Sequence, residues 1–377
     1  MSKLIFFPTS TIVNGNYELY PNIKELLLGL KEDDDYVYLI SHNFNKSKRV
    51  KQILGEGFDF VKTITRKTVR EIIDTSNSSH VVLVGSNDVD LHLTANKKML
   101  LLNPLWSETQ EEKAVKYGFG VSTPQKLHQI IRILNNQNVW FYELAINYNT
   151  KVYSLTNANT RTVRSESEIE LMEGFNKLLK YGEHKYFDAL LFHFLASIIN
   201  NLEFQQVDIW GIMPSSSQNL NDHMLQIKEK ARLLMGRRNE EAIFIRHTQT
   251  IKSHHLKHLE RLHCDRHFDS IIINPYYKGR LHSKTICILD DYLTNGTSFE
   301  TLRNMLLHEG VKKIIFVSLG RFRRSAGIEY LQQDYNFIGD LYEPNFQYDN
   351  VSRQDLHGTY KDEANEDIKK LYTIISS

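Results

Sequence analysis

The stretch that decides the fold is KTICILDDYLTNGTSFE, residues 284–300. Within it, residues 285–289 (TICIL) form a short apolar run of the length that a buried parallel strand requires. Two adjacent carboxylates, Asp290 and Asp291, come directly after this run, and we call them the acidic pair. Residues 299–308 then carry apolar side chains at helical spacing. The stretch therefore predicts a strand, an acidic strand end, a short loop and a helix, which is the repeating unit of an α/β fold.

A small loop rich in hydroxyl groups separates the acidic pair from this helix. We call it the phosphate loop, and it consists of Thr294, Asn295, Gly296, Thr297 and Ser298. A loop that opens a helix presents free backbone N–H groups, and the helix dipole adds positive potential there. Gly296 lets an anion approach the backbone closely. Because the acidic pair accepts hydrogen bonds from hydroxyl groups, the stretch predicts a ligand with a phosphate beside a ribose diol.

The residues I-L-D-D-Y-L-T-N-G-T-S resemble the phosphoribosyl pyrophosphate (PRPP) motif of the type I phosphoribosyltransferases, a hydrophobic strand followed by D-D-x-x-T-T-G-x-T. The sequence departs from that motif at Asn295 and Ser298, which are both small and polar. The resemblance implies that the phosphate loop binds the 5′-phosphate of PRPP. It also implies that Asp290 and Asp291 hold the ribose hydroxyls, directly or through a Mg²⁺ ion on PRPP. An ordinary acidic turn before a helix is the alternative.

A second polar strand end lies upstream, where residues 207–212 (VDIWGI) predict a strand. The serine loop that follows consists of Pro214, Ser215, Ser216 and Ser217. In the ComF-like branch of the same family, the first core strand ends in Pro followed by Ser, at the loop that holds pyrophosphate. The resemblance therefore assigns pyrophosphate binding to the serine loop. Backbone amides and three hydroxyls also suit a diphosphate chemically, and a plain serine-rich turn is the alternative.

Residues 246–267 resemble the hood that closes over PRPP in these enzymes. Closure would exclude water that hydrolyses the donor. The resemblance makes Arg246 and Arg261 the candidates for neutralising the departing pyrophosphate.

The hood segment is unusually rich in histidine. His254 and His258 are four residues apart, as are His263 and His267, with Cys264 nearby. That spacing suits a zinc site. No Cys-x-x-Cys or His-Glu-x-x-His signature accompanies it, so a solvated, partly helical loop is the favoured interpretation. Phosphate contact by one or two of the histidines is a further alternative.

The first half of the chain alternates apolar strands with helices, which predicts a parallel α/β sheet. The predicted strands cover residues 4–7, 36–40, 81–84 and 98–102. Their polar ends resemble the haloacid dehalogenase (HAD) superfamily, with Ser41 at the second position and residues 85–90 at the last. Residues 6–11 contain no Asp, whereas the chemistry of that superfamily needs an Asp nucleophile there. We therefore expect a HAD-like domain without catalysis, which serves binding or assembly; a generic Rossmann-like sandwich is the alternative.

Composition limits the class of protein. At 377 residues the chain is long enough for about two domains. We place a HAD-like domain at 1–135 and a phosphoribosyltransferase-like domain with a C-terminal cap helix at 136–377. The predicted fold class is α/β, with each domain a parallel-sheet layer sandwich. A net charge of +1 does not favour direct nucleic-acid binding, and no apolar run is long enough to span a membrane. The two cysteines exclude a disulfide framework and fit a reducing cytoplasm.

These features predict a phosphoribosyltransferase that uses PRPP and Mg²⁺, transfers phosphoribosyl to an unidentified base or nucleotide-like acceptor, and releases pyrophosphate. After residues 313–319, Arg321, Arg323 and Arg324 either bind an anionic acceptor or form a solvated turn. The competing hypothesis is a non-catalytic sensor or effector that binds PRPP or a nucleotide, because the pairing of domains resembles modules of bacterial stress-response and phage-defence systems. Simple hydrolysis of PRPP or a nucleotide is the third hypothesis. A protein partner on the HAD-like domain and a homodimer are further expectations.

Overall fold

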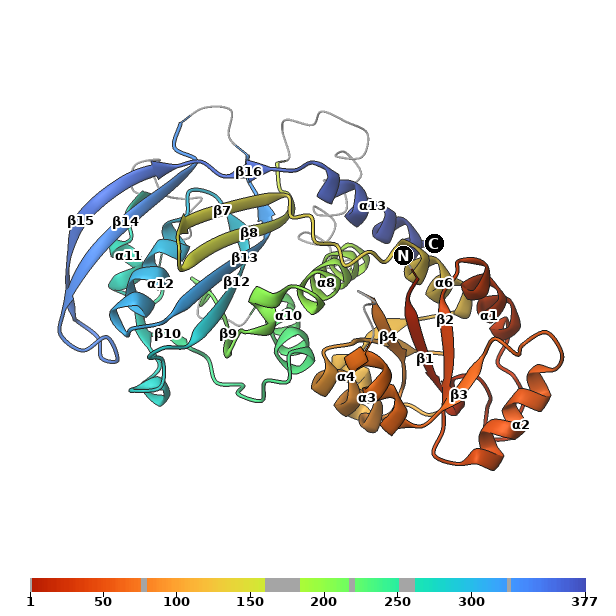
Figure 1. Ribbon diagram of the computed structural model, residues 1–377. Coiled ribbons are helices and arrows are strands. Elements are labelled where there is room, and N and C mark those ends of the chain that lie inside the picture. The colour runs from red at the N-terminus through yellow and green to blue at the C-terminus, as the bar shows by residue number, and fades with distance from the viewer. Residues whose placement is uncertain (1, 76–79, 160–183, 217–220, 251–261, 324–326) are drawn as a thin grey trace.

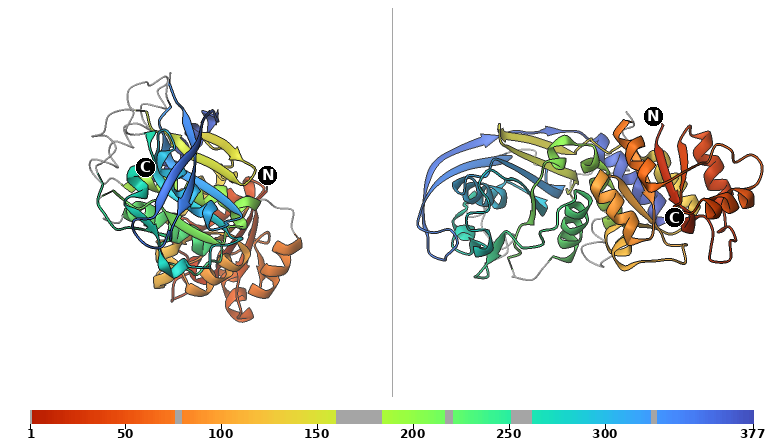
Figure 2. Two further views of the ribbon diagram at one scale, coloured as in Figure 1. Left: turned by 90° about the vertical axis from the view of Figure 1, so that its left-hand side faces the viewer. Right: turned by 60° about the horizontal axis from the view of Figure 1, so that its bottom comes forward.

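The computed structural model describes residues 2–75, 80–159, 184–216, 221–250, 262–323 and 327–377 (Figure 1). It contains two separate six-stranded sheets with helices packed around them, so the predicted α/β class is confirmed. The strands of the first sheet all precede residue 122, and those of the second all follow residue 141. The two sheets lie toward opposite ends of an elongated molecule, as Figure 1 and the right-hand view of Figure 2 show.

The first sheet is entirely parallel, with strand order β3-β2-β1-β4-β5-β6. Its strands are β1 (Leu4–Pro8), β2 (Tyr36–Ile40), β3 (Lys62–Ile64), β4 (Val81–Val84), β5 (Leu100–Pro104) and β6 (Phe119–Val121). Its helices are α1 (Ile23–Glu32), α2 (Phe44–Leu54), α3 (Arg66–Thr75), α4 (Asp88–Lys97), α5 (Glu112–Tyr117) and α6 (Pro124–Ile133). The strand order reverses between β1 and β4, and doubly wound sheets bind ligands at the carboxyl ends of the strands at this point.

The second sheet has the order β16-β7-β8-β13-β12-β9. Its strands are β7 (Tyr142–Asn147), β8 (Thr150–Asn157), β9 (Ile209–Ile212), β12 (Thr285–Leu293), β13 (Lys313–Arg321) and β16 (Thr359–Tyr360). β8, β13, β12 and β9 are parallel, as the sequence predicts, whereas β7 and β16 add an antiparallel edge. The antiparallel edge arises because β7 and β8 are joined by a tight turn, which cannot connect parallel strands.

Two smaller sheets complete the second half. β10 (Phe244–Arg246) pairs with β11 (Ile271–Ile273), and β14 (Tyr330–Ile338) pairs with β15 (Gln347–Leu356) in a long antiparallel ribbon. The remaining helices are α8 (His184–Ile199), α9 (Leu202–Gln205), α10 (Asp222–Leu234), α11 (Asp265–Phe268), α12 (Thr297–His308) and α13 (Glu363–Ser376). α13 is the predicted C-terminal helix, and it packs on α6, α8 and β8.

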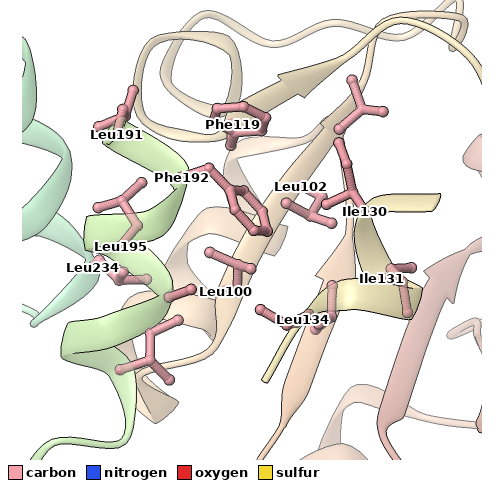
Figure 3. Packing of buried hydrophobic residues seen from close by; sticks show 14 of the residues in the cluster. Leu100, Leu102, Phe119, Ile130, Ile131, Leu134, Leu191, Phe192, Leu195 and Leu234 are labelled. Carbon is pink, nitrogen blue, oxygen red and sulfur yellow. The ribbon is translucent and has the colours of Figure 1, made fainter. Parts of the chain in front are cut away.

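A hydrophobic core joins the two halves of the molecule. α8 is apolar on all sides, and it packs against both β5 of the first sheet and β8 of the second. Figure 3 shows Phe192 of α8 directed toward Phe119 and Leu102, and the rings of Phe119 and Phe192 meet edge to face at 5.1 Å. Lys230 of α10 adds a polar contact, because its ammonium donates to the carbonyl of Lys116 at 2.8 Å. The two halves therefore share buried surface as well as a chain connection.

Within the described ranges, no helix combines the length and the apolar character that crossing a bilayer requires.

Candidate functional site

The acidic pair lies inside strand β12 rather than beyond its end. The sequence predicts that the strand stops at residue 289, but pairing with β13 continues through Asp290, opposite Ser318, to Leu293, opposite Arg321. Apolar character alone therefore underestimates the length of the strand. Backbone pairing with the long neighbour β13 extends β12 past two polar residues, Asp290 and Asp291. Both carboxylates are half-buried at the carboxyl end of the parallel strands.

The two carboxylates of the acidic pair oppose each other's ionisation. Burial raises the pKa of Asp290 well above its ordinary value, and the charge of Asp291 and a hydrogen bond between the two carboxyls raise it further. The guanidinium of Arg246 acts in the opposite direction. A hydrogen-bond donor or a cation at this place would relieve the repulsion. The acidic pair is thus chemically suited to bind the hydroxyls of a diol.

A divalent cation fits the site only through its ligand. Mg²⁺ prefers six oxygen ligands and is commonly held by one or two carboxylates together with substrate phosphates. Among the described residues no group of three or more His, Cys, Asp or Glu side chains is placed to hold a metal ion. Asp290 and Asp291 would therefore contribute one or two oxygens, and a bound diphosphate would contribute others.

The phosphate loop makes a tight entry into α12. Gly296 is the N-cap residue with a φ of 85°, in the left-handed region that glycine adopts at little cost. The side-chain oxygen of Asn295 accepts hydrogen bonds from the hydroxyls of Thr294 at 3.3 Å and Thr297 at 3.1 Å. Asn295 therefore organises the loop, and the departure from the family motif at this position places a carbonyl acceptor between two hydroxyls.

Two backbone amides of the phosphate loop, those of Gly296 and Ser298, remain open to a ligand. The described part of the chain provides no acceptor for the backbone N–H of Gly296 or of Ser298. Both lie at the start of the 12-residue helix α12, whose dipole favours an anion at that end. The loop therefore has the donors that phosphate binding needs.

Arg321 holds the loop from the protein side. Its side chain is fully buried, and it donates to the carbonyls of Leu293 at 3.3 Å and of Thr294. It also lies over the ring of Tyr142 at 4.7 Å. In addition, the backbone N–H of Leu331 donates to the carbonyl of Asn295 at 3.0 Å. With these carbonyls turned into the protein, the N–H groups of Gly296 and Ser298 face the side where a ligand would bind.

This placement differs from both interpretations that the sequence suggests for Arg321, an acceptor-binding residue or a solvated turn. Nothing in the local sequence signals the burial, which depends on Tyr142 and the β14–β15 ribbon far away in the chain. Arg323 is half-exposed and lies over the ring of Tyr360 at 4.6 Å. Arg324 lies outside the described residues.

The serine loop lies beside the acidic pair. The backbone N–H of Met213 donates to the carbonyl of Leu289 at 2.9 Å, so the loop begins next to Asp290. Pro214, Ser215 and Ser216 are half-buried, and Ser217 lies outside the described residues. The carboxyl ends of the parallel neighbours β9 and β12 thus bring two segments together that are about 75 residues apart.

Arg246 connects the serine loop with the acidic pair. It is buried, its guanidinium donates to the carbonyl of Pro214 at 3.1 Å, and it also donates to the hydroxyl of Ser270 at 2.5 Å. Burial and the nearby Arg266 lower the pKa of Arg246 to about 10, whereas the charge of Asp290 acts to raise this pKa. Arg246 therefore fixes the position of the serine loop and supplies positive charge next to the acidic pair. Arg261, the second predicted arginine of the hood, lies outside the described residues.

The described ends of the hood segment contact the two loops of the site, although Thr248 and Gln249 are exposed. At one end the backbone N–H of Thr250 donates to the carbonyl of Ser216 at 3.2 Å. At the other, the thiol of Cys264 donates to the carbonyl of Thr297 at 3.6 Å. His267 is buried, and burial lowers its pKa well below the ordinary value. His254 and His258, on which half of the zinc alternative depends, lie outside the described residues.

In the first half, the acidic residues at the strand ends are engaged within the protein. A carboxylate oxygen of Asp88 accepts from the backbone N–H groups of Lys113 at 3.1 Å and Ala114 at 3.2 Å. Asp90 has no exposed surface and pairs with Arg66 at 2.6 Å. The segment 85–90, which the sequence places at the polar end of a predicted strand, already contains the start of α4. These two carboxylates are therefore not placed to hold a metal ion for a ligand.

Comparison with models of protein families, with curated proteins and with solved structures gave no match to this chain. Any functional assignment therefore depends on the geometry described above and on the motif resemblance in the sequence. Sequence reasoning missed Tyr330 and considered other roles for Arg321; both residues lie behind the phosphate loop. No local pattern identifies them, because their role comes from packing across β13 and β14.

Proposed function

We propose that this protein is a PRPP-dependent phosphoribosyltransferase that transfers phosphoribosyl to a base or nucleotide-like acceptor and releases pyrophosphate. The observation that carries the proposal is the convergence of three segments at one edge of the second sheet. The acidic pair lies near the carboxyl end of β12, the phosphate loop opens α12, and the serine loop follows the neighbouring strand β9. These segments offer two anion-binding loops with a diol-binding carboxylate pair beside them, which matches the groups of PRPP.

In this proposal each group of PRPP has its own partner. The backbone amides at Gly296 and Ser298 bind the 5′-phosphate, with the hydroxyl of Thr294 beside them. Asp290 and Asp291 accept hydrogen bonds from the ribose 2′ and 3′ hydroxyls. The serine loop, held in place by Arg246, binds pyrophosphate. Mg²⁺, when bound with PRPP, would neutralise part of the diphosphate charge.

The reaction is a substitution at C1′ of the ribose. A nucleophilic nitrogen of the acceptor forms a bond to C1′ while the bond from C1′ to the pyrophosphate oxygen breaks, and both electrons of that bond leave with pyrophosphate. The protein contributes mainly positioning and charge stabilisation. A carboxylate of the acidic pair that is ionised when PRPP is bound favours the positive charge that develops on the ribose ring.

A second candidate function is binding of PRPP or a nucleotide without turnover, as a sensor or effector. The observation in its favour is that Arg246 and Arg321, the described arginines at the site, are both buried and donate to backbone carbonyls. Such arginines position loops more directly than they stabilise a leaving group. A partner on the first half of the molecule would then receive the signal. Hydrolysis of PRPP or a nucleotide is the third candidate. The two buried, unpaired cysteines are compatible with the cytoplasm in each case.

The test measures pyrophosphate release from PRPP with Mg²⁺ by the full chain, against a panel of bases and nucleosides. A calorimetric titration with PRPP is run in parallel. The double variant Asp290→Asn/Asp291→Asn should lose PRPP binding and release. Asp349→Asn, an exposed carboxylate on β15, is the matched control and should keep both. Release with one acceptor supports transfer, and release without an acceptor supports hydrolysis. Binding without release supports a sensor. If PRPP does not bind at all, or if the double variant behaves as the wild type, the proposed site is wrong.

A further inference from the structure

The first half contains a crevice that has no part in the site described above. It lies where the strand order reverses, at the carboxyl ends of β1 and β2 and the start of α4, and its volume is about 350 Å³. Small-molecule sites commonly enclose about 300 to 1,000 Å³. Six of its lining residues carry the argument: Thr9, Ser10, Ser41, His42, Lys46 and Arg66. Its position and size are those of a ligand site in a doubly wound sheet.

The lining of the crevice is polar and basic. Lys46 and Arg66 contribute cations, and hydroxyl and amide side chains make up most of the rest. None of the residues that line it carries a carboxylate. Arg66 uses one terminal nitrogen to bind Asp90, which is fully buried, and the Arg66 side chain is 18% exposed. Because a guanidinium has five N–H donors, Arg66 keeps donors for a ligand.

The walls of the crevice are held in place by bonds of their own. The hydroxyl of Ser41 accepts from the backbone N–H of Asn43 at 3.1 Å, and the side chain of Asn43 caps α2 by accepting from the backbone N–H of Lys46 at 3.1 Å. On the opposite wall, the hydroxyl of Ser107 donates to the carbonyl of Ser10 at 3.1 Å. A preformed site avoids the entropy cost of ordering loops when a ligand binds.

We propose that this crevice binds a small phosphate ester through its phosphate group, without a divalent cation and without converting the ligand. Two cations and several hydroxyls in a carboxylate-free crevice favour an anion, and phosphate offers the acceptor oxygens that they require. Two carboxylates near the crevice are of the type that holds a metal ion or attacks a phosphorus atom, but both have other partners. Asp88 accepts hydrogen bonds from backbone amides, and Asp90 is buried against Arg66. This inference is independent of the function proposed for the second half.

The experiment titrates ribose 5-phosphate into the full chain in excess EDTA and follows heat or chemical-shift changes, with ribose as the unphosphorylated control. It uses the Asp290→Asn/Asp291→Asn background, in which the second-half site is disabled. We expect saturable binding of ribose 5-phosphate, no binding of ribose and no release of inorganic phosphate. Lys46→Gln should weaken binding about tenfold, which corresponds to about 1.4 kcal/mol. Lys48→Gln, an exposed lysine on the same helix, should leave it unchanged.

The proposal is overturned if ribose 5-phosphate does not bind in this background, if binding requires Mg²⁺, or if inorganic phosphate is released. Equal binding by the Lys46 and Lys48 variants would also overturn it. Thermal unfolding of each variant identifies loss of fold, and the mild Lys46→Gln change is chosen over changes at Arg66, which also holds Asp90. A failure of PRPP binding in the wild type would leave these outcomes unaffected.

Discussion

The ring of Tyr330 occupies the space that a side chain at residue 296 would fill. A Cβ built on Gly296 would come within 2.4 Å of a ring carbon of Tyr330, which is far shorter than van der Waals contact. The hydroxyl of Tyr330 donates to Glu300 at 2.8 Å, so the ring cannot easily move away. The phosphate loop is therefore closed against β14 at its glycine, and the site depends on a strand that follows it by about 35 residues.

Gly296→Ala should consequently destabilise the protein and abolish PRPP binding. The substitution combines a left-handed φ with a steric clash, and we expect it to lower the free energy of unfolding by about 2–4 kcal/mol. Gly279→Ala is the matched control, because Gly279 has a similar φ of 71° and nothing within 4 Å of the added carbon. Urea unfolding measures the free energy of unfolding of both variants. Because both glycines have a positive φ, the difference between the two losses gives the cost of the clash with Tyr330. Equal losses would show that the ring moves aside at no cost.

Arg303→Leu should be among the most destabilising substitutions in α12. Glu300 is fully buried, and Arg303 binds it through two nitrogens, at 2.9 and 2.6 Å. Removing the arginine leaves a buried carboxylate without its cation, which costs about 3–5 kcal/mol in comparable cases. The double variant Glu300→Leu/Arg303→Leu should lose less than the sum of the single losses. Additive losses in urea unfolding would show that the pair acts as two independent residues.

Arg321→Met should weaken PRPP binding more than it weakens the fold. The side chain holds the carbonyls of Leu293 and Thr294, and without it the phosphate loop loses its fixed orientation. We expect the Kd for PRPP to rise about tenfold or more, which corresponds to at least about 1.4 kcal/mol. Arg323→Met is the control, because Arg323 is half-exposed and contacts Tyr360 instead. Calorimetric titration compares the Kd for PRPP of the two variants. An unchanged Kd for Arg321→Met would show that Arg321 does not orient the phosphate loop for binding.

The local pattern predicts much of the central unit of the second sheet. The apolar run of β12, the polar loop and the helical spacing of α12 are all contained within about 25 residues, where period and composition are informative. Other elements gave weaker signals. β3 and β6 have only three residues each, and β15 is exposed along nearly its whole length, so neither apolar runs nor a clear alternation mark them.

The same contrast holds within the candidate site. The acidic pair and the phosphate loop are visible in the sequence because their chemistry lies in consecutive residues. The roles of Arg246 and Arg321 are not visible in the sequence, because each role depends on which backbone carbonyl the guanidinium contacts across the sheet. A sequence pattern identifies an arginine as a cation, but only the fold decides whether that cation faces a ligand or the backbone of a neighbouring loop.

The contact between the two halves should make stability depend on pH. Asp188 of α8 is half-buried near Lys230, and burial raises its pKa from 3.8 to about 6, although the charges of His184 and Lys230 oppose the shift. The folded state therefore binds a proton more tightly than the unfolded state does. This contribution to stability is fully present below about pH 4 and is lost as the pH rises through about 6.

Asp188→Asn should remove this dependence. Relative to the wild type, the free energy of unfolding of the variant should rise between pH 4 and pH 7 by up to about 3 kcal/mol, since one pKa unit corresponds to about 1.4 kcal/mol. Urea unfolding at several pH values measures the difference in free energy of unfolding between the variant and the wild type. The titration of the other groups is common to both proteins and largely cancels in this difference. Asp59→Asn, an exposed carboxylate of the first half, should show no such trend. A constant difference between Asp188→Asn and the wild type would mean that Asp188 is ionised in the fold, so that hydration or Lys230 offsets its burial.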